Sequence, residues 1–263
     1  MTIPFTKAHG ARNDFLLTWR DSLPENQLDR AETARAICDR HTGVGADGWL
    51  IVSPKTPGTD GAIELWNSDG SRSEVSGNGT RCAAAFLLEA GLAGNDVHIA
   101  TGAGVKHLRL LDRRGNRFSF EMNMGTPLVE QLYARFEDRD CVILNVGNPQ
   151  CAFFVENFDF DWPALGARIE HHSRFPHRTN VSFVRVVDPH TVDVRFFERG
   201  AGETMSSGTG STGAAAAAVS RNFAVPPVRV LTQAGPLDLR WKGNDIFLAG
   251  PAALVARGEF LLN

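Results

Sequence analysis

The stretch SGNGTRCAAA at residues 76–85 returns in altered form as SGTGSTGAAA at residues 207–216. The two stretches lie 131 positions apart (207 − 76 = 131), about half of the 263-residue chain, and six of their ten positions are identical. Each follows a strand-like run that ends in a polar turn, AIELWNSDG at 62–70 and VDVRFFERG at 192–200. Because an internal repeat determines the architecture of a chain, the sequence predicts two similar α/β halves.

Within each half the order is a strand, a glycine-rich turn and a helix of small residues. Alternating residues in Ile63–Trp66 and in Val192–Phe197 are typical of strands. The runs Cys82–Ala90 and Gly213–Arg221 are apolar on nearly every side, which indicates buried helices. We therefore predict an α/β (α+β) protein of two pseudo-symmetric halves, each a mixed or antiparallel β-sheet wrapped around a buried central helix.

The boundary between the halves is expected near residues 122–128, where a glycine and a proline interrupt the pattern. One surface helix is predicted in each half, at Ala31–Asp39 and at Trp162–Arg168. The expected domains are residues 1–122 joined by a C-terminal strand at 251–263, and residues 123–250. Further strands are expected at Gly48–Val52, Lys106–Leu111, Phe118–Met122, Cys141–Leu144, Ala152–Val155, Val181–Val187, Val228–Leu231 and Asp245–Leu248.

Composition narrows the classes of partner. The net charge is −3, and the charges are interspersed, so neither a nucleic-acid-binding face nor a polybasic membrane anchor is indicated. The four cysteines are too widely spaced for a CxxC pair, which favours a reducing compartment. The N-terminal MTIPFTKAHG lacks the apolar core of a signal peptide. We expect a cytoplasmic protein whose partner is a small molecule, with no nucleic-acid or membrane partner.

The two serine-glycine turns predict an anion site. A helix that begins directly after SGNG or SGTG presents backbone N–H groups and the positive end of its dipole. Two such turns would hold one carboxylate or phosphate from both sides of a cleft between the halves. Ser76 and Ser207 would lie beside that anion, which suits chemistry at the carbon next to a carboxylate. Each serine is also a favourable helix N-cap, and the two roles are compatible.

The second turn also contains a dinucleotide fingerprint, GxGxxG, formed by Gly208, Gly210 and Gly213. That fingerprint requires a strand directly before it and an acidic residue about 20 positions further on. Here ETMSS at 203–207 intervenes, and the segment 228–237 contains no acidic residue. The sequence therefore disfavours a nicotinamide or flavin site.

Segments spread in order along nearly the whole chain resemble the diaminopimelate epimerase family. The resemblance implies a cofactor-independent isomerase of two similar halves, which interconverts LL- and meso-diaminopimelate by α-proton transfer without pyridoxal phosphate or metal. It also implies a role in lysine and peptidoglycan precursor synthesis, a substrate in the interdomain cleft and a homodimer. The matching segments are FTKAHGARNDF (5–15), CDRHTGVGADG (38–48), NSDGSRSEVSGNGTRC (67–82), NVGNPQ (145–150), FPHRTNVSF (175–183), ERGAGETMSSGTG (198–210) and GPA (250–252).

The resemblance assigns roles to individual residues. In the family a cysteine precedes each glycine turn; one thiolate removes the α-proton and the other thiol returns a proton to the opposite face. Ser76 and Ser207 occupy these catalytic positions. An arginine fork suits a carboxylate and a carboxylate suits an ammonium, so a glutamate beside an arginine can read an amino-acid end group. The implied substrate-binding residues are Asn13, Asn67, Gly77, Asn78, Asn148, Asn180, Glu198, Arg199, Gly208 and Thr209.

Two departures from the family bear on activity. A thiol with a pKa near 8.5 supplies some thiolate at neutral pH, whereas a serine needs a neighbouring base. The sequence shows no such base beside Ser76 or Ser207. The family motif GNPH reads GNPQ here, so Gln150 replaces a histidine that handles protons. We therefore expect weak or absent epimerase activity. Serines at both positions fit natural divergence or deliberate replacement, and Gln150 favours divergence.

Two alternatives remain open. An isomerase or dehydratase of the same fold that acts on another small acid would tolerate the loss of one acid/base partner. A non-catalytic amino-acid-binding homologue would keep the ligand-binding groups without turnover. Exchange of the α-proton separates the first alternative from the second.

Overall fold

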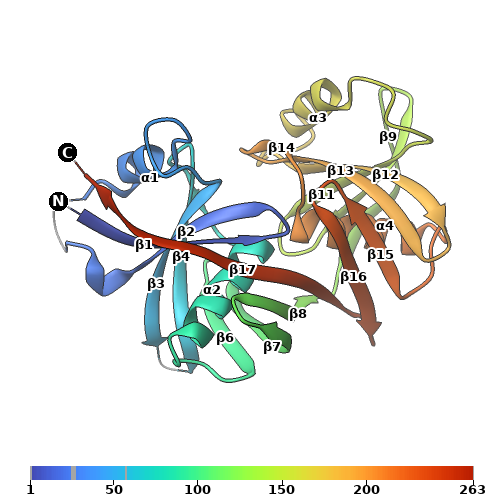
Figure 1. The fold of residues 1–263 in the computed structure, drawn as a ribbon. Coiled ribbons are helices and arrows are strands. Elements are labelled where there is room, and N and C mark those ends of the chain that lie inside the picture. Colours follow the sequence, from blue (N-terminus) through green and yellow to red (C-terminus); the bar gives the residue numbers. More distant parts are fainter. Residues whose placement is uncertain (1, 25–27, 57, 263) are drawn as a thin grey trace. The chain divides into compact units, whose positions relative to one another are not determined.

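The computed structural model describes residues 2–24, 28–56 and 58–262. The chain divides into two compact units, unit 1 comprising residues 1–122 and 250–263 and unit 2 comprising residues 123–249. Figure 1 traces the elements of each unit, coloured along the chain. Two strands, β8 (Arg117–Gly125) and β17 (Asp245–Leu261), carry the chain from one unit into the other.

Unit 1 is a closed sheet around one helix. Its strands follow the order β17–β1–β2–β3–β4–β6–β7–β8, with β2–β3 and β4–β6 parallel and the other pairs along this order antiparallel. Pairing of β17 with β8 closes the sheet. The elements are β1 (Thr2–Gly10), β2 (Asn13–Trp19), a 3-10 turn (Arg20–Ser22), α1 (Arg30–Cys38), β3 (Gly48–Thr56), β4 (Thr59–Asn67), β5 (Arg72–Ser73), α2 (Gly77–Glu89), β6 (Asp96–Thr101) and β7 (Gly104–Arg114).

Unit 2 repeats this connectivity. Its order is β9–β10–β11–β12–β13–β15–β16–β17, with β11–β12 and β13–β15 parallel. A parallel pair needs a crossover, and each unit supplies one surface helix and one central helix for its two parallel pairs. The elements are β9 (Leu128–Phe136), β10 (Arg139–Asn145), β11 (Pro149–Phe154), α3 (Trp162–Glu170), β12 (Asn180–Asp188), β13 (Thr191–Glu198), β14 (Gly202–Thr204), α4 (Gly208–Ser220), β15 (Val228–Thr232) and β16 (Gly235–Lys242).

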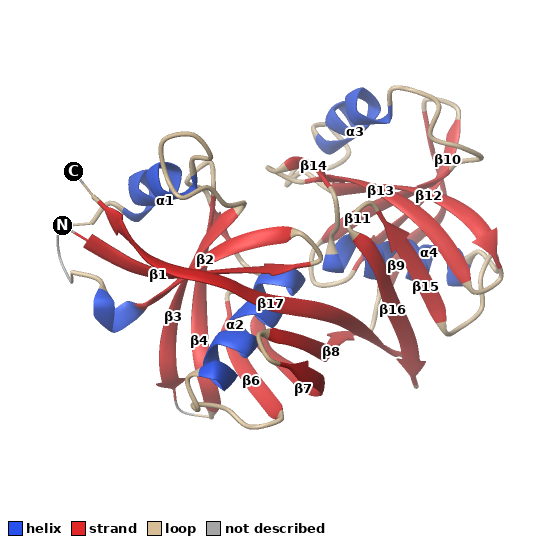
Figure 2. Ribbon diagram, in the orientation of Figure 1, coloured by secondary structure: helices blue, strands red, loops and turns tan. Residues whose placement is uncertain are grey.

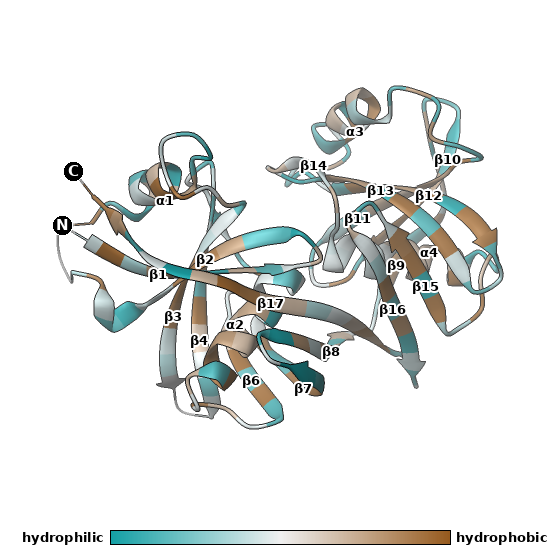
Figure 3. Cartoon of the chain, viewed as in Figure 1, coloured by the Kyte–Doolittle hydropathy of each residue, from teal (hydrophilic) through white to brown (hydrophobic). Residues whose placement is uncertain are grey.

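The central helices α2 and α4 are buried over most of their length, Gly77–Leu87 in α2 and Gly208–Ala218 in α4. In Figure 2 each lies among the strands of its own unit. Small side chains let the surrounding strands approach the helix closely, and Ala214–Ala218 pack in a core with valines and leucines of those strands. The strands show alternating hydrophobic and hydrophilic bands, as on β6 in Figure 3, because only one face contacts the core. The predicted fold class is confirmed.

Both central helices begin earlier than their apolar runs suggest. The runs start at Cys82 and Gly213, whereas the helices start at Gly77 and Gly208. The glycine turn itself forms the first helical turn, because the preceding serine caps it. The two surface helices lie where the sequence predicts them, with α1 capped by Asp29 and α3 by Asp161.

Candidate functional site

Ser76 and Ser207 are the N-caps of α2 and α4. Ser76 Oγ accepts a hydrogen bond from Gly79 N at 3.1 Å, and Ser207 Oγ accepts one from Gly210 N at 3.0 Å. In each helix the N–H of the third residue donates to the cap serine, and the N–H groups of the first two residues point out of the helix end. A side chain at Gly210 would clash, since its Cβ would lie 2.7 Å from the Phe196 ring. Both turns thus present N–H donors and a helix dipole to an anion.

A carboxylate lies beside Ser207. Ser207 Oγ donates to Glu198 Oε2 at 2.8 Å, and Thr204 Oγ1 donates to Glu198 Oε1 at 2.7 Å. The expectation that neither serine has a neighbouring base is therefore wrong for Ser207. Glu198 precedes Ser207 by nine residues, but the short β13–β14 hairpin pairs Phe196 with Thr204 and folds the chain back. In the sequence, the polar turn at residues 198–200 indicates a chain reversal before the repeat, but it does not show that the returning strand brings Ser207 back to Glu198.

The segment that carries Glu198 and Arg199 is anchored from two sides. Arg199 N donates to Asn180 Oδ1 at 3.0 Å, and Asn180 Nδ2 donates in turn to Pro149 O at 3.0 Å. Gly200 N donates to Glu170 Oε1 at 2.9 Å. Glu170 is only 3% exposed, and sequence reasoning missed it because it lies on a surface helix far along the chain. These bonds fix the backbone on either side of Arg199.

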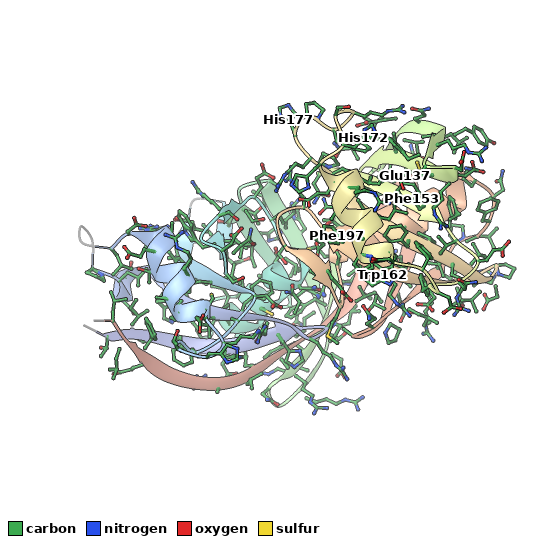
Figure 4. All side chains as sticks on the ribbon, turned by 90° about the horizontal axis from the view of Figure 1, so that it is seen from above. Glu137, Phe153, Trp162, His172, His177 and Phe197 are labelled. Atoms are coloured by element: carbon green, nitrogen blue, oxygen red, sulfur yellow. The ribbon has the colours of Figure 1, made fainter. Side chains whose placement is uncertain are left out.

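Helix α3 packs against the strand that ends at Glu198. Figure 4 labels Phe153, Trp162 and Phe197, which come from β11, α3 and β13 and belong to one hydrophobic core cluster or pack against it. Gly166 of α3 approaches Phe197 so closely that an added Cβ would lie 2.7 Å from Phe197 Cβ. The core of unit 2 thereby holds the end of β13 in place.

Gln150 orients a neighbouring amide. Gln150 Nε2 donates to Asn148 Oδ1 at 2.7 Å, and Asn148 Nδ2 donates to Thr209 Oγ1 at 3.3 Å, on the first turn of α4. Gln150 is 1% exposed and packs against Gly213. Since a carboxamide does not titrate, Gln150 acts through Asn148 rather than by proton transfer.

In unit 1 two predicted binding residues meet. Asn78 Nδ2 donates to Asn13 Oδ1 at 3.2 Å, and Asn13 Nδ2 donates to Asp47 Oδ2 at 2.7 Å. Asn67, the counterpart of Glu198, makes its side-chain bond within its own turn, from Nδ2 to Ser71 Oγ at 3.0 Å. The residue at the end of the preceding strand therefore differs between the units: Glu198 places a carboxylate beside Ser207, whereas its counterpart Asn67 bonds within its own turn.

Charged side chains surround the Asn13 end of unit 1. Asp14 forms ion pairs with Lys7 at 3.1 Å and Arg40 at 2.8 Å. Burial raises the pKa of the Asp14 carboxyl, but hydrogen bonds from Arg40 and Lys7 outweigh this effect and hold the pKa below its ordinary value. Asp14 is thus a carboxylate at neutral pH, and it is engaged with two cations.

The cysteines do not replace the missing thiols at the turns. All four, Cys38, Cys82, Cys141 and Cys151, are free and buried. Burial raises the pKa of Cys82 to about 12, even though Cys82 lies in the N-terminal half of α2, toward the end where a helix dipole favours a thiolate. Among residues 2–24, 28–56 and 58–262, no group of three or more His, Cys, Asp and Glu side chains is arranged to hold a metal ion. No helix in the same part of the chain is long and apolar enough to cross a membrane.

The fold is shared with solved structures of low sequence identity. A phenazine biosynthesis protein of the PhzF family from Bacillus anthracis superposes with a TM-score of 0.76 at 16% identity, covering 100% of both chains. A hydroxyproline epimerase from Agrobacterium vitis, solved with bound trans-4-hydroxy-L-proline, gives a TM-score of 0.73 at 15% identity, covering 98% of this chain and 90% of that one.

Sequence comparison is more specific. The diaminopimelate epimerase family model matches residues 5–129 and 142–255. A diaminopimelate epimerase from Pelotomaculum thermopropionicum is 37% identical over 275 residues, covering 97% of this chain and 98% of that protein. The chain belongs to the diaminopimelate epimerase family, which is a family of isomerases and serves lysine biosynthesis.

Proposed function

We propose that this protein binds diaminopimelate and moves its α-proton with a serine–glutamate pair in place of a thiol. The observation that carries the proposal is the 2.8 Å hydrogen bond from Ser207 Oγ to Glu198 Oε2 at the N-terminus of α4. A carboxylate in this position is the general base that a serine needs to accept a proton from carbon. Family membership supports the substrate and the isomerase chemistry.

The Cα–H bond of the substrate breaks, and its electron pair is delocalised into the substrate carboxylate. Ser207 Oγ takes the proton while its own hydrogen passes to Glu198 Oε2. The outward N–H group of Gly208, at the N-terminus of α4, would stabilise the negative charge that develops on the carboxylate. Arg199 would bind the substrate's remote carboxylate.

Completion of epimerisation requires a proton from the opposite face, and the family resemblance assigns that role to Ser76. A hydroxyl is a far weaker acid than a thiol, and Asn67 supplies no carboxylate beside Ser76. Proton removal and return on the Ser207 side should therefore be faster than inversion. The protein would exchange the α-proton of diaminopimelate with solvent more rapidly than it forms the other stereoisomer.

The test follows exchange and inversion together. LL-diaminopimelate is incubated with the protein in deuterated water, α-deuterium uptake is followed by NMR and the meso isomer by chiral chromatography. We expect Glu198→Gln to slow exchange by about 100-fold, and Ser76→Ala to abolish inversion while exchange persists. Glu203→Gln, an exposed glutamate of the same hairpin, is the matched control. Absence of both exchange and binding in the unaltered protein would refute the proposal.

A second candidate is a one-base isomerase or dehydratase that acts on another small acid. Ser207 has Glu198 beside it, whereas the corresponding upstream residue of unit 1 is Asn67, which is not a base. This difference favours the second candidate, because removal of one proton followed by a double-bond shift or loss of a β-substituent needs a single base. Exchange with diaminopimelate that never yields the meso isomer, together with turnover of a β-substituted acid, would favour this candidate. Binding without any exchange would instead indicate a non-catalytic homologue.

We also propose that the protein works in the cytoplasm, on a small amino acid, and as a homodimer. The charge balance and family membership support this setting. The chain mass is 28.6 kDa, so light scattering after gel filtration should report about twice that value. A monomer mass at micromolar concentration would contradict the dimer.

A further inference from the structure

Arg81, the fifth residue of α2, is fully buried and forms no ion pair with a carboxylate of the described residues. Its side chain is 0% exposed, and no described acidic residue forms an ion pair with it. Nε donates to Pro251 O at 3.1 Å, Nη2 donates to Asn78 Oδ1, and Nη1 has no partner among the described atoms. Burial lowers the pKa of Arg81 to about 10. Burying an unpaired cation is unfavourable, so its retention calls for a role.

The hydrogen bonds of Arg81 give a direction to the amides beyond it. A carboxamide accepts at one end and donates at the other, whereas a guanidinium only donates. Because Arg81 donates to Asn78 Oδ1, the Asn78 Nδ2 end is turned toward Asn13 Oδ1, at 3.2 Å. The same orientation is passed on, since Asn13 Nδ2 donates to Asp47 Oδ2 at 2.7 Å. A flipped Asn78 would place donor against donor at Arg81 and acceptor against acceptor at Asn13.

The position of Arg81 depends on a glycine far along the chain. A Cβ at Gly250 would lie 2.8 Å from Arg81 Cζ, so the guanidinium fits only because residue 250 has no side chain. The next residue, Pro251, supplies the carbonyl that Arg81 Nε binds. The GPA segment at 250–252 and the GNGTRC segment at 77–82 are therefore two parts of one buried contact.

We propose that Arg81 is a positioning residue that fixes the carboxamides of Asn78 and Asn13 in one orientation before the substrate binds. The proposal rests on the proposed function only for the identity of the ligand. The orientation itself is a property of the unliganded protein, so it can be measured without turnover.

The first measurement is hydrogen exchange of the side-chain amides of Asn13 and Asn78 by NMR. In the unaltered protein both should exchange more slowly than the amide of the exposed Asn95. Arg81→Met should speed exchange at both by about tenfold, the loss expected for a charged donor, and Arg81→Lys should restore part of the protection. If Arg81→Met does not fold, Gly250→Ala decides the question, because it displaces the guanidinium but keeps the charge.

The matched control is Thr212→Val, at the position of α4 that corresponds to Arg81 in the repeat (81 + 131 = 212). Thr212 is 1% exposed, and its Oγ1 donates to Gly208 O within the helix. This variant removes a buried polar group of comparable placement from unit 2. Exchange at Asn13 and Asn78 should not change.

The second measurement is the dissociation constant for diaminopimelate by calorimetry. We expect it to rise about tenfold in Arg81→Met and in Gly250→Ala, and less in Arg81→Lys. The proposal would be overturned if Arg81→Met and Gly250→Ala both fold and both leave the amide exchange and the affinity unchanged. If the unaltered protein does not bind diaminopimelate, the proposed function fails, while the amide exchange still decides the role of Arg81.

Discussion

The turns at Ser76 and Ser207 share one backbone and differ in what faces the serine. The φ and ψ angles are −128° and 124° at Ser76 and −133° and 127° at Ser207, and each hydroxyl caps its helix in the same way. Nine residues upstream, however, one turn has Asn67, bonded to Ser71, and the other has Glu198, bonded to the serine itself. The repeat therefore preserves the capped backbone of the turn, whereas groups capable of acid/base chemistry differ between the halves.

Restoring thiols should have the largest effect and should be unequal between the turns. Ser76→Cys places a group with a pKa near 8.5 at the turn whose upstream residue is Asn67 rather than a glutamate, so we expect inversion of diaminopimelate to rise about 100- to 1000-fold. Ser207→Cys should add only about tenfold, because Ser207 already has a base beside it. Initial rates of meso formation measure both. A larger gain from Ser207→Cys would show that Glu198 does not activate the serine.

A second test removes the difference between the two turns. Glu198→Asn gives unit 2 the residue that unit 1 has at Asn67, and we expect α-proton exchange to fall by about 100-fold. Thr204→Val removes one of the two hydroxyls that donate to Glu198, and exchange should fall about fivefold, the value of one hydrogen bond. Equal losses in the two variants would indicate that the hairpin as a whole, rather than the carboxylate, is required.

A further prediction concerns stability at another pair of repeated positions, Glu64 in β4 and Arg195 in β13. Burial raises the pKa of Glu64, but hydrogen bonds from Arg20, Trp66 and Arg30 outweigh it and hold the pKa below 4.5. This stabilisation is therefore present above pH 4.5 and is lost as the pH falls through the lowered pKa. Glu64→Gln should reduce the free energy of unfolding by about 2 kcal/mol at pH 7 and by less at pH 3.

Urea unfolding at both pH values measures this difference. Arg195→Gln, which breaks a half-buried ion pair with Asp193, should cost about 1 kcal/mol or less. If Glu64→Gln is equally destabilising at pH 7 and pH 3, the lowered pKa of Glu64 does not contribute to stability.

The sequence predicts the architecture best where a pattern is local. Apolar runs identify the buried helices, because neither α2 nor α4 has a polar face, and the serines before them mark the caps. Strands β1 and β2 were not predicted, even though they line the core of unit 1. In β1 the buried residues are Ile3 and then Thr6, Ala8 and Gly10, so the alternation changes phase between Ile3 and Thr6. A strand prediction that relies on a period of two fails across such a phase change.

The site was predictable as a set of residues but not as a set of contacts. Family resemblance supplies Asn148 and Thr209, yet only the fold brings them within 3.3 Å. The contact of Glu198 with Ser207 depends on a tight hairpin, in which Gly200 and Gly202 have φ angles of 76° and 74°. Glu170 could not be found, because its role is to hold a backbone N–H of that hairpin. Residues that act on the backbone leave no side-chain motif.

The pairing of β1 with β17 sets the order in which the two units can fold during synthesis on the ribosome. Thr2 of β1 pairs with Leu261 of β17, so unit 1 cannot close its sheet until residue 261 has been synthesised. Unit 2 is continuous from residue 123 to residue 249 and is finished earlier. At about 5–20 residues per second, synthesis of residues 126–261 takes roughly 7–27 seconds, and the first eight strands wait that long for their closing partner. During that time the edge of β1 is exposed, which makes it the part of the nascent protein most in need of protection from aggregation.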